Sequence, residues 1–350
     1  MRGGAVIIML QGHVTHSFMQ SDLRGQSPYM LSQFVGGITP AVFLFLTGIT
    51  LAFLMDSRWR AGEAPLSRIK TALLRAGYLA LLAAGFRLQL WTFAAGQSNW
   101  TDLFKVDILN CMAFTMVVLS PLAALNTRAR VRWALTAGLG VACLAPIVSA
   151  ANWSWLHPFV QHYFVPDLNY FSLFPWGAFL AFGVAAGSIL RLVKQDELTR
   201  IMPWGALIGL ALVAGAQYCS NLPYSIYSRS DFWLNSPGLI LIKTGVLLLF
   251  LSLAFLWTRF IAPAGFSALR QLGTTSLLVY WVHTELVYGR WFGQYKERLS
   301  AGQCAAVAVA LILLMVALST LRTRLKHSGA LRLRLGFWPF QPAPSPAAGD

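Results

Sequence analysis

The sequence predicts an all-α protein, a polytopic transmembrane helix bundle of about ten spans. Hydrophobic residues make up 57% of the 350 residues, and charged residues only 11%, against about 25% charged in an average soluble domain. Long apolar runs recur along the whole chain, and short polar or basic segments separate them. We therefore expect a multi-pass membrane protein.

Each predicted span is an apolar run of the length that a bilayer requires, about 20 residues. The first is the weakest, because Gln11, His13 and His16 interrupt it. These spans form a transmembrane domain over residues 1–325, and residues 326–350 form a cytoplasmic basic tail rich in Pro and Ala. The spans are expected at residues 3–19, 37–55, 71–93, 104–125, 132–150, 169–190, 202–219, 237–257, 272–289 and 301–321.

Basic residues between the spans set the orientation, because cytoplasmic loops carry an excess of Lys and Arg. Placing the amino terminus inside puts 19 of the 27 Lys and Arg residues in the cytoplasm and five outside. Both termini are therefore predicted to be cytoplasmic. The same distribution attributes the net charge of +15 to topology and to contact with membrane lipids, so no nucleic-acid partner is expected.

Several ionisable residues fall inside the predicted spans, where charge is costly and tends to mark function. On this topology they all lie in the outer half of the membrane. Simple structural roles exist for some, since Lys105 can snorkel and Arg87 can pair with Asp107. As a set they predict a polar cavity that opens outward, suited to proton transfer or ion conduction. The set comprises His13, His16, Arg87, Lys105, Asp107, Lys243, His283 and Glu285.

Histidine is the natural general base in such a cavity, because its pKa lies near neutrality. Asp107 could orient an imidazole or neutralise a nearby Arg, and Tyr280 lies one turn before His283 on the same helix face. The four cysteines form no C-x-x-C pair, so neither a disulfide framework nor a metal site is predicted.

Five stretches, in order, resemble heparan-α-glucosaminide N-acetyltransferases and their bacterial relatives. Residues 2–13 (RGGAVIIMLQGH) look like the opening helix of that family, and residues 39–48 (TPAVFLFLTG) resemble its second helix. Residues 103–113 (LFKVDILNCMA) are similar to its VDILQ helix, and residues 171–183 (FSLFPWGAFLAFG) to its FPW helix. Residues 272–286 (LGTTSLLVYWVHTEL) resemble its carboxy-terminal helix.

The resemblance, which includes bacterial relatives, implies a protein of a bacterial inner (cytoplasmic) membrane. It also implies transfer of an acetyl group from cytosolic acetyl-CoA to an amino-sugar or glycan acceptor on the outer side. His13 takes the helix-end position of the family's site, and His16 follows one turn later. The loop histidine of the eukaryotic enzyme has no counterpart in residues 17–33, which leaves open which histidine is essential. We predict catalytic roles for His13, His16, Asp107 and His283, and substrate binding by Arg87, Lys105, Asn110, Lys243, Glu285 and Trp176.

Two other functions remain open. A proton-coupled secondary transporter could use the same buried charges as a relay, and a membrane O-acyltransferase would differ only in acting on a polysaccharide hydroxyl. The sequence also leaves open the acceptor, direct transfer against an acetyl-histidine intermediate, and a homodimer. Family members usually carry an acidic residue shortly before the Arg2-Gly3 pair, so whether Met1 is the true start is open too.

Overall fold

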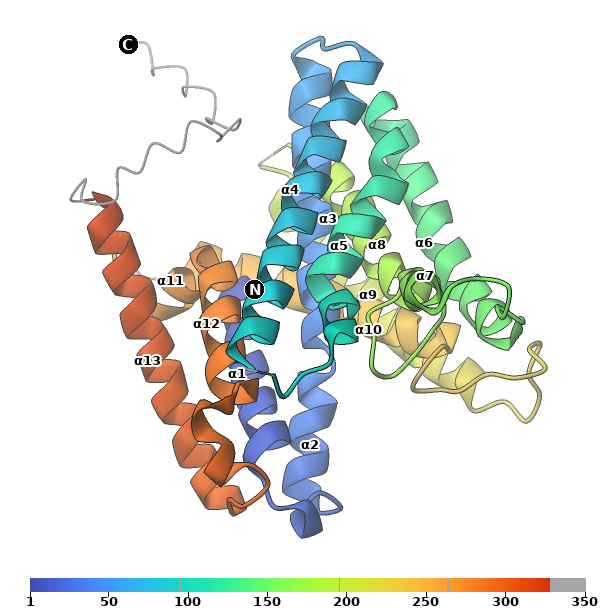
Figure 1. The fold of residues 1–350 in the computed structure, drawn as a ribbon. Coiled ribbons are helices and arrows are strands. Elements are labelled where there is room, and N and C mark those ends of the chain that lie inside the picture. The colour runs from blue at the N-terminus through green and yellow to red at the C-terminus, as the bar shows by residue number, and fades with distance from the viewer. Residues whose placement is uncertain (95, 195, 263–264, 328–350) are drawn as a thin grey trace.

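The computed structural model describes residues 1–94, 96–194, 196–262 and 265–327, and every regular element in these ranges is a helix (Figure 1). The predicted all-α class is therefore confirmed. The elements are α1 (Arg2–Phe18), η1 (Ser21–Leu23), α2 (Ser27–Gly36), α3 (Thr39–Arg60), α4 (Pro65–Phe93), η2 (Trp100–Phe104), α5 (Ile108–Leu119), η3 (Ser120–Ala124), α6 (Thr127–Ala150), α7 (Pro158–Phe164), α8 (Leu173–Leu192), α9 (Leu198–Ser220), α10 (Pro237–Leu256), η4 (Trp257–Ile261), α11 (Ala268–Thr274), α12 (Ser276–Tyr288), η5 (Arg290–Tyr295) and α13 (Ala301–His327).

Seven helical segments of the described chain are long and apolar enough to cross a membrane, which makes this a multi-pass membrane protein. They are 27–60, 65–93, 127–150, 173–192, 198–220, 237–261 and 301–326. The other three predicted spans fall on shorter helices. Span 3–19 is α1, with 17 residues, span 104–125 divides into α5 and η3, and span 272–289 divides into α11 and α12. The count of about ten crossings and the cytoplasmic termini stay predictions.

The division of span 104–125 has a local cause. Asp107 adopts an extended conformation and caps α5, so the helix begins only at Ile108 and Lys105 lies in the preceding connection. Ser120 and Pro121 then tighten the chain into η3, where proline cannot continue the backbone ladder of an α-helix. Lys105 was expected inside a span, and the structure corrects this placement.

Glycine allows a close backbone contact between α3 and α8. A Cβ atom at Gly48 would lie 2.1 Å from the Leu180 carbonyl oxygen, and one at Gly183 would lie 2.1 Å from the Phe45 carbonyl oxygen. Small residues let helix backbones approach in this way inside membranes. The α3–α8 contact, joined by α6, forms the centre of the larger buried cluster.

Two buried apolar clusters divide the fold. The larger draws mainly on α3, α4, α5, α6, α8 and α10, with Ala5 of α1 and Ala123 of η3, and the smaller on α1, α11, α12 and α13. Helices α9 and α10 pack on each other, and α10 also contacts α3, α6 and α8. The boundary between the two clusters, where α1 meets α3, positions the candidate site.

The predicted tail of residues 326–350 lies almost entirely outside the described residues, which reach His327 in α13. The predicted boundary at residue 325 lies within α13, two residues before the last described residue, and it stays a prediction.

Candidate active site

A cavity of 1980 Å³ lies between the two clusters, with walls from α1, α2, α3, α4, α5, α8, α10 and α12. Its lining includes Arg2 and His13 of α1, and Lys70 and Arg87 of α4. Lys70 and Arg87 are 17 residues apart on one helix, which corresponds to about 26 Å at a rise of 1.5 Å per residue. The cavity is thus an elongated passage with a basic end at Arg2, Lys70 and Arg75 and a histidine end at His13 and His16.

His13 and His283 form a direct hydrogen bond at the histidine end. His13 Nδ1 lies 2.9 Å from His283 Nε2, and the rings stack with centroids 5.2 Å apart. His283 is completely buried, whereas His13 is half-buried and lines the cavity. The two rings come from α1 and α12, which are 270 residues apart in sequence.

The partners of the two rings fix their tautomers. His283 Nδ1 lies 2.7 Å from the Val279 carbonyl oxygen, which can only accept, so His283 carries its proton on Nδ1. Its Nε2 then accepts the hydrogen bond from His13 Nδ1–H. His13 Nε2 is left with a lone pair and with no hydrogen-bond partner in the described chain. This pair therefore leaves one basic nitrogen without a partner in the described chain, on a residue that lines the cavity.

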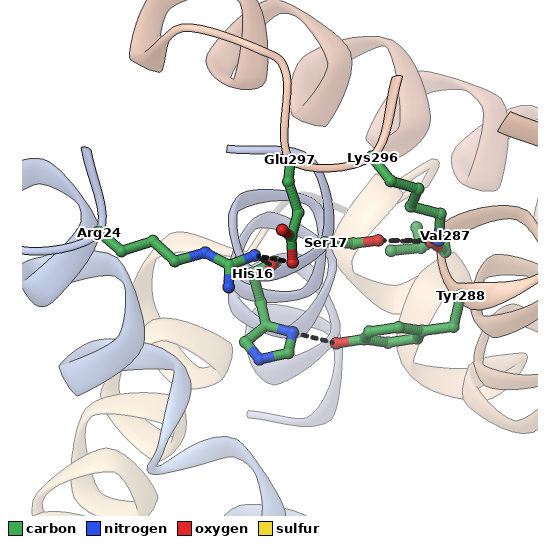
Figure 2. A network of polar contacts seen from close by, with 7 residues as sticks. All are labelled: His16, Ser17, Arg24, Val287, Tyr288, Lys296 and Glu297. Atoms are coloured by element: carbon green, nitrogen blue, oxygen red, sulfur yellow. Dashed lines mark hydrogen bonds and ion pairs between the residues drawn. The ribbon is translucent and has the colours of Figure 1, made fainter. Parts of the chain in front are cut away.

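Tyr288 stands beside both cavity histidines, and sequence reasoning did not select it. Its hydroxyl lies 3.5 Å from His16 Nδ1 (Figure 2). Its ring packs against the His13 ring in a T-shaped arrangement, with the two centroids 5.2 Å apart. Tyr280, Thr284 and Tyr288 all line the cavity at intervals of four residues on α12. This i, i+4 pattern of polar groups on one face was the available signal.

A set of contacts around residues 16–24 and 287–297, which we call the clasp, ties the end of α1 to the end of α12 (Figure 2). Arg24 donates to the His16 carbonyl oxygen at 3.0 Å and pairs with Glu297 at 2.9 Å. Lys296 donates to Ser17 Oγ at 2.9 Å and also to the Val287 carbonyl oxygen. Ser17 lies four residues after His13, and Val287 lies four residues after His283. By joining these positions, the clasp helps to hold the His13 and His283 rings together.

Asp107 pairs with Arg87, with Oδ2 3.1 Å from the Arg87 Nε. Its other oxygen accepts from the backbone N–H groups of Leu109 and Asn110 at 2.9 and 3.1 Å, which caps α5. The Asn110 side chain also donates to Asp107 and contacts the Tyr163 hydroxyl at 3.5 Å. Of the two roles considered for Asp107, the structure shows the neutralisation of Arg87.

The remaining predicted residues separate into two groups. Lys105, Lys243 and Trp176 line the cavity, and Lys105 pairs there with Asp102 at 2.8 Å. Glu285 is buried and accepts from Trp291 Nε1 at 2.9 Å, and it is not among the residues that line the cavity. The structure therefore assembles most of the predicted set and places Glu285 apart from it.

The described residues of the cavity contain no candidate metal site. Among the residues that the structure describes, no group of three or more His, Cys, Asp or Glu side chains is placed to hold a metal ion.

The fold and the site together define a class: a multi-pass membrane protein whose helices enclose a cavity with a hydrogen-bonded histidine pair. A comparison with protein families gives the particular family. The family model described as "Heparan-alpha-glucosaminide N-acetyltransferase, catalytic" matches residues 1–221, and the chain belongs to this family. Membership makes it a transferase of the acyl-transfer type.

The matched range contains His13, His16 and Asp107, whereas Lys243 and His283 lie beyond it. No curated protein matches the chain. The pairing of His13 with His283 is thus known from the geometry of this structure alone.

Proposed function

We propose that this protein transfers an acetyl group from cytosolic acetyl-CoA to an amino-sugar or glycan acceptor on the outer side of a bacterial inner membrane. The observation that carries the proposal is the single unpaired nitrogen of the histidine pair, His13 Nε2, in a cavity whose other end is basic. A base facing an elongated cavity suits acyl transfer between two substrates that enter from opposite ends.

The donor enters at the basic end. Arg2 and Arg75 are half-buried, and neither forms an ion pair or hydrogen bond with another part of the described chain. Guanidinium groups bind phosphate through several N–H donors, so these two side chains and Lys70 would take the phosphates of acetyl-CoA. The thioester end of the donor would then extend along α4 toward His13.

His13 acts as the general base. Its Nε2 accepts a proton from the acceptor amine while the amine nitrogen forms a bond to the thioester carbonyl carbon. The carbon–sulfur bond of the tetrahedral intermediate then breaks, and the imidazolium returns the proton to the CoA thiolate. The products are an N-acetylated acceptor and free CoA. In the alternative route His13 Nε2 attacks the thioester itself and carries the acetyl group briefly.

The neighbours of His13 support this step. His283 accepts a hydrogen bond from His13 Nδ1–H in both protonation states of His13, and that bond strengthens when His13 becomes cationic. The Tyr288 hydroxyl, together with the positive charges of Arg87 and Lys105, would stabilise the oxyanion. Asp107 has a positioning role, because it holds Arg87 and begins α5. His16, on the exposed side of Tyr288, would contact the acceptor.

The test uses the purified full-length protein in detergent, radiolabelled acetyl-CoA and glucosamine, and follows free CoA and labelled sugar separately. We expect labelled sugar from the wild type and a loss of about 10²–10⁴-fold in His13→Ala. His157→Ala serves as a matched control, because His157 is an exposed loop histidine outside the cavity. Full activity in both His13→Ala and His16→Ala would refute the proposed mechanism.

The same assay separates the other functions. Labelled product only with a hydroxyl acceptor would identify an O-acyltransferase. Substrate flux into proteoliposomes without consumption of acetyl-CoA would identify a transporter.

A further inference from the structure

The lining of the cavity is strongly unbalanced in charge. Six Lys and Arg side chains line it, and no Asp or Glu is among the described lining residues. Three of the six belong to the basic end, where the proposed donor enters. The other three are Arg87, Lys105 and Lys243.

Lys243 differs from its two neighbours in having no acidic partner. Arg87 pairs with Asp107 and Lys105 pairs with Asp102. Lys243 lies in α10, and its Nζ donates at 3.1 Å to the carbonyl oxygen of Gly37 at the end of α2. No carboxylate of the described chain forms an ion pair with it. A cation within an apolar helix is costly without a counter-ion, so this one is set to receive a negative charge.

An aromatic ring accompanies this charge. Lys243 Nζ lies 5.1 Å from the centroid of the Trp176 ring, and both side chains line the cavity. Indole rings stack on the apolar faces of sugars as well as attracting cations. An aromatic ring and an ammonium without an acidic partner in the described chain, side by side, form a subsite for a sugar that carries an anionic substituent.

Glycine backbone places this subsite next to the histidine pair. Gly37, the partner of Lys243, follows Gly36, and a Cβ atom on Gly12 would lie 3.5 Å from the Gly36 Cα. Gly12 directly precedes His13. Gln33 reinforces the contact by donating to the Gly12 carbonyl oxygen at 3.1 Å. Lys243 is thus separated from the proposed base by a thin layer of backbone, and both side chains reach the same cavity.

We propose that Lys243 and Trp176 bind a hexosamine acceptor that carries a phosphate or a carboxylate group, and that Lys243 selects this acceptor over a neutral sugar. The ammonium binds the anionic oxygen atoms, the indole ring supports the sugar face, and the amino group of the sugar reaches His13 Nε2. The inference rests on the proposed acetyl transfer and names its acceptor class. The donor phosphates occupy the opposite end of the cavity and leave Lys243 free for the acceptor.

The experiment compares glucosamine with glucosamine 6-phosphate in the wild type, Lys243→Met and Lys243→Arg, measuring kcat/KM for each acceptor. A charge-assisted contact predicts a preference of about 10- to 100-fold for the phosphorylated sugar in the wild type. Lys243→Met should abolish this preference by lowering kcat/KM far more for the phosphorylated sugar than for glucosamine, while Lys243→Arg should retain most of the preference. Lys70→Met, at the basic end, is the matched control and should leave the preference intact.

Two outcomes would overturn the inference. One is equal use of both sugars by the wild type. The other is an equal loss with both sugars in Lys243→Met, which would assign Lys243 to the oxyanion or to the structure of α2. A disaccharide of glucosamine and glucuronic acid distinguishes the sources of charge, since a preference for it over glucosamine 6-phosphate selects a carboxylate.

Direct binding separates this inference from the proposed function. Calorimetric titration of glucosamine 6-phosphate into wild type and Lys243→Met requires no turnover. Lys243-dependent binding without any acetyl transfer would support the subsite and refute the reaction. Acetyl transfer with binding of the phosphorylated sugar that does not depend on Lys243 would refute the subsite and support the reaction.

Discussion

The hydrogen bond between His283 and His13 leads to the sharpest test of the site. In the wild type, His283 Nε2 lies 2.9 Å from His13 Nδ1 and accepts its hydrogen bond. Replacing His283 with Leu fills a similar buried volume and removes this acceptor. His13 can then rotate or take its other tautomer, in which Nε2 is protonated and cannot act as a base. The catalytic step should slow without any loss of substrate contacts.

The expected magnitude follows from the charge that His13 gains. A hydrogen bond to a charged group contributes about 1.5–3 kcal/mol, and the bond between the two histidines becomes charge-assisted only when His13 has taken the proton. Its removal should therefore lower kcat by about 10- to 150-fold. His13→Ala should lose more, about 10²–10⁴-fold, because it removes the base itself.

The assay is the initial rate of acetyl transfer, with kcat and the KM for acetyl-CoA determined separately. His283→Leu should lower kcat and leave this KM unchanged. His283→Gln is the informative companion, because its amide oxygen can replace Nε2 as an acceptor and should restore part of kcat. Size-exclusion and thermal-unfolding profiles establish that each variant is folded.

Two results would refute the reasoning. If His283→Leu keeps kcat within twofold of the wild type, the pair is only a packing contact. If Leu and Gln variants lose activity equally while remaining folded, the acceptor atom is not what matters.

Further predictions concern the frame of the site. Gly183→Ala should lower the free energy of unfolding by about 1–3 kcal/mol through overpacking, because its Cβ would lie 2.1 Å from the Phe45 carbonyl oxygen. Gly140→Ala is the control and should be tolerated, because a Cβ there meets nothing within 4 Å. Asp107→Asn should unfold at a higher temperature than Asp107→Ala, because Asn still caps α5 and a cap contributes about 1 kcal/mol; equal midpoints would argue against the cap. Lys296→Met should raise hydrogen exchange of the amides of residues 297–299, which bond to the end of α1, and unchanged protection would show that the clasp does not depend on Lys296.

Much of the fold could be predicted because length and hydropathy are local properties. Each long helix that qualifies as a span overlaps a predicted one. The average hydropathy of residues 104–125 did not reveal that this segment divides into two helices, because an average over about 20 residues does not register single capping residues. The signals were present in the sequence, since Asp107 precedes α5 and Pro121 follows it. Membrane spans are found by composition, whereas their ends are set by individual backbone hydrogen bonds.

The site could be predicted in its members but not in its pairs. Ionisable groups in apolar runs identified His13, His283 and Lys243 one by one, since each is costly in hydrocarbon. The contact of His13 with His283 depends on how α1 and α12 are rotated against each other, and no local pattern encodes that. Helical geometry could have corrected one prediction, the placement of His283 and Glu285 in the same cavity. The two residues are two positions apart, or about 200° around α12, so their side chains leave the helix on opposite faces.

The short first helix, the weakest span by hydropathy, gains a physical meaning from the site. α1 has 17 residues, about 26 Å at 1.5 Å per residue, somewhat less than a bilayer core of about 30 Å. Arg2 at its start and His13 and His16 near its end all line the cavity. A longer and fully apolar helix would move one of these ends away from the cavity, and an uninterrupted apolar run would lack the proposed base. We infer that the polar interruptions of α1, together with its short length, allow one helix to present the proposed phosphate-binding cation and the proposed catalytic imidazole to the two ends of the same cavity.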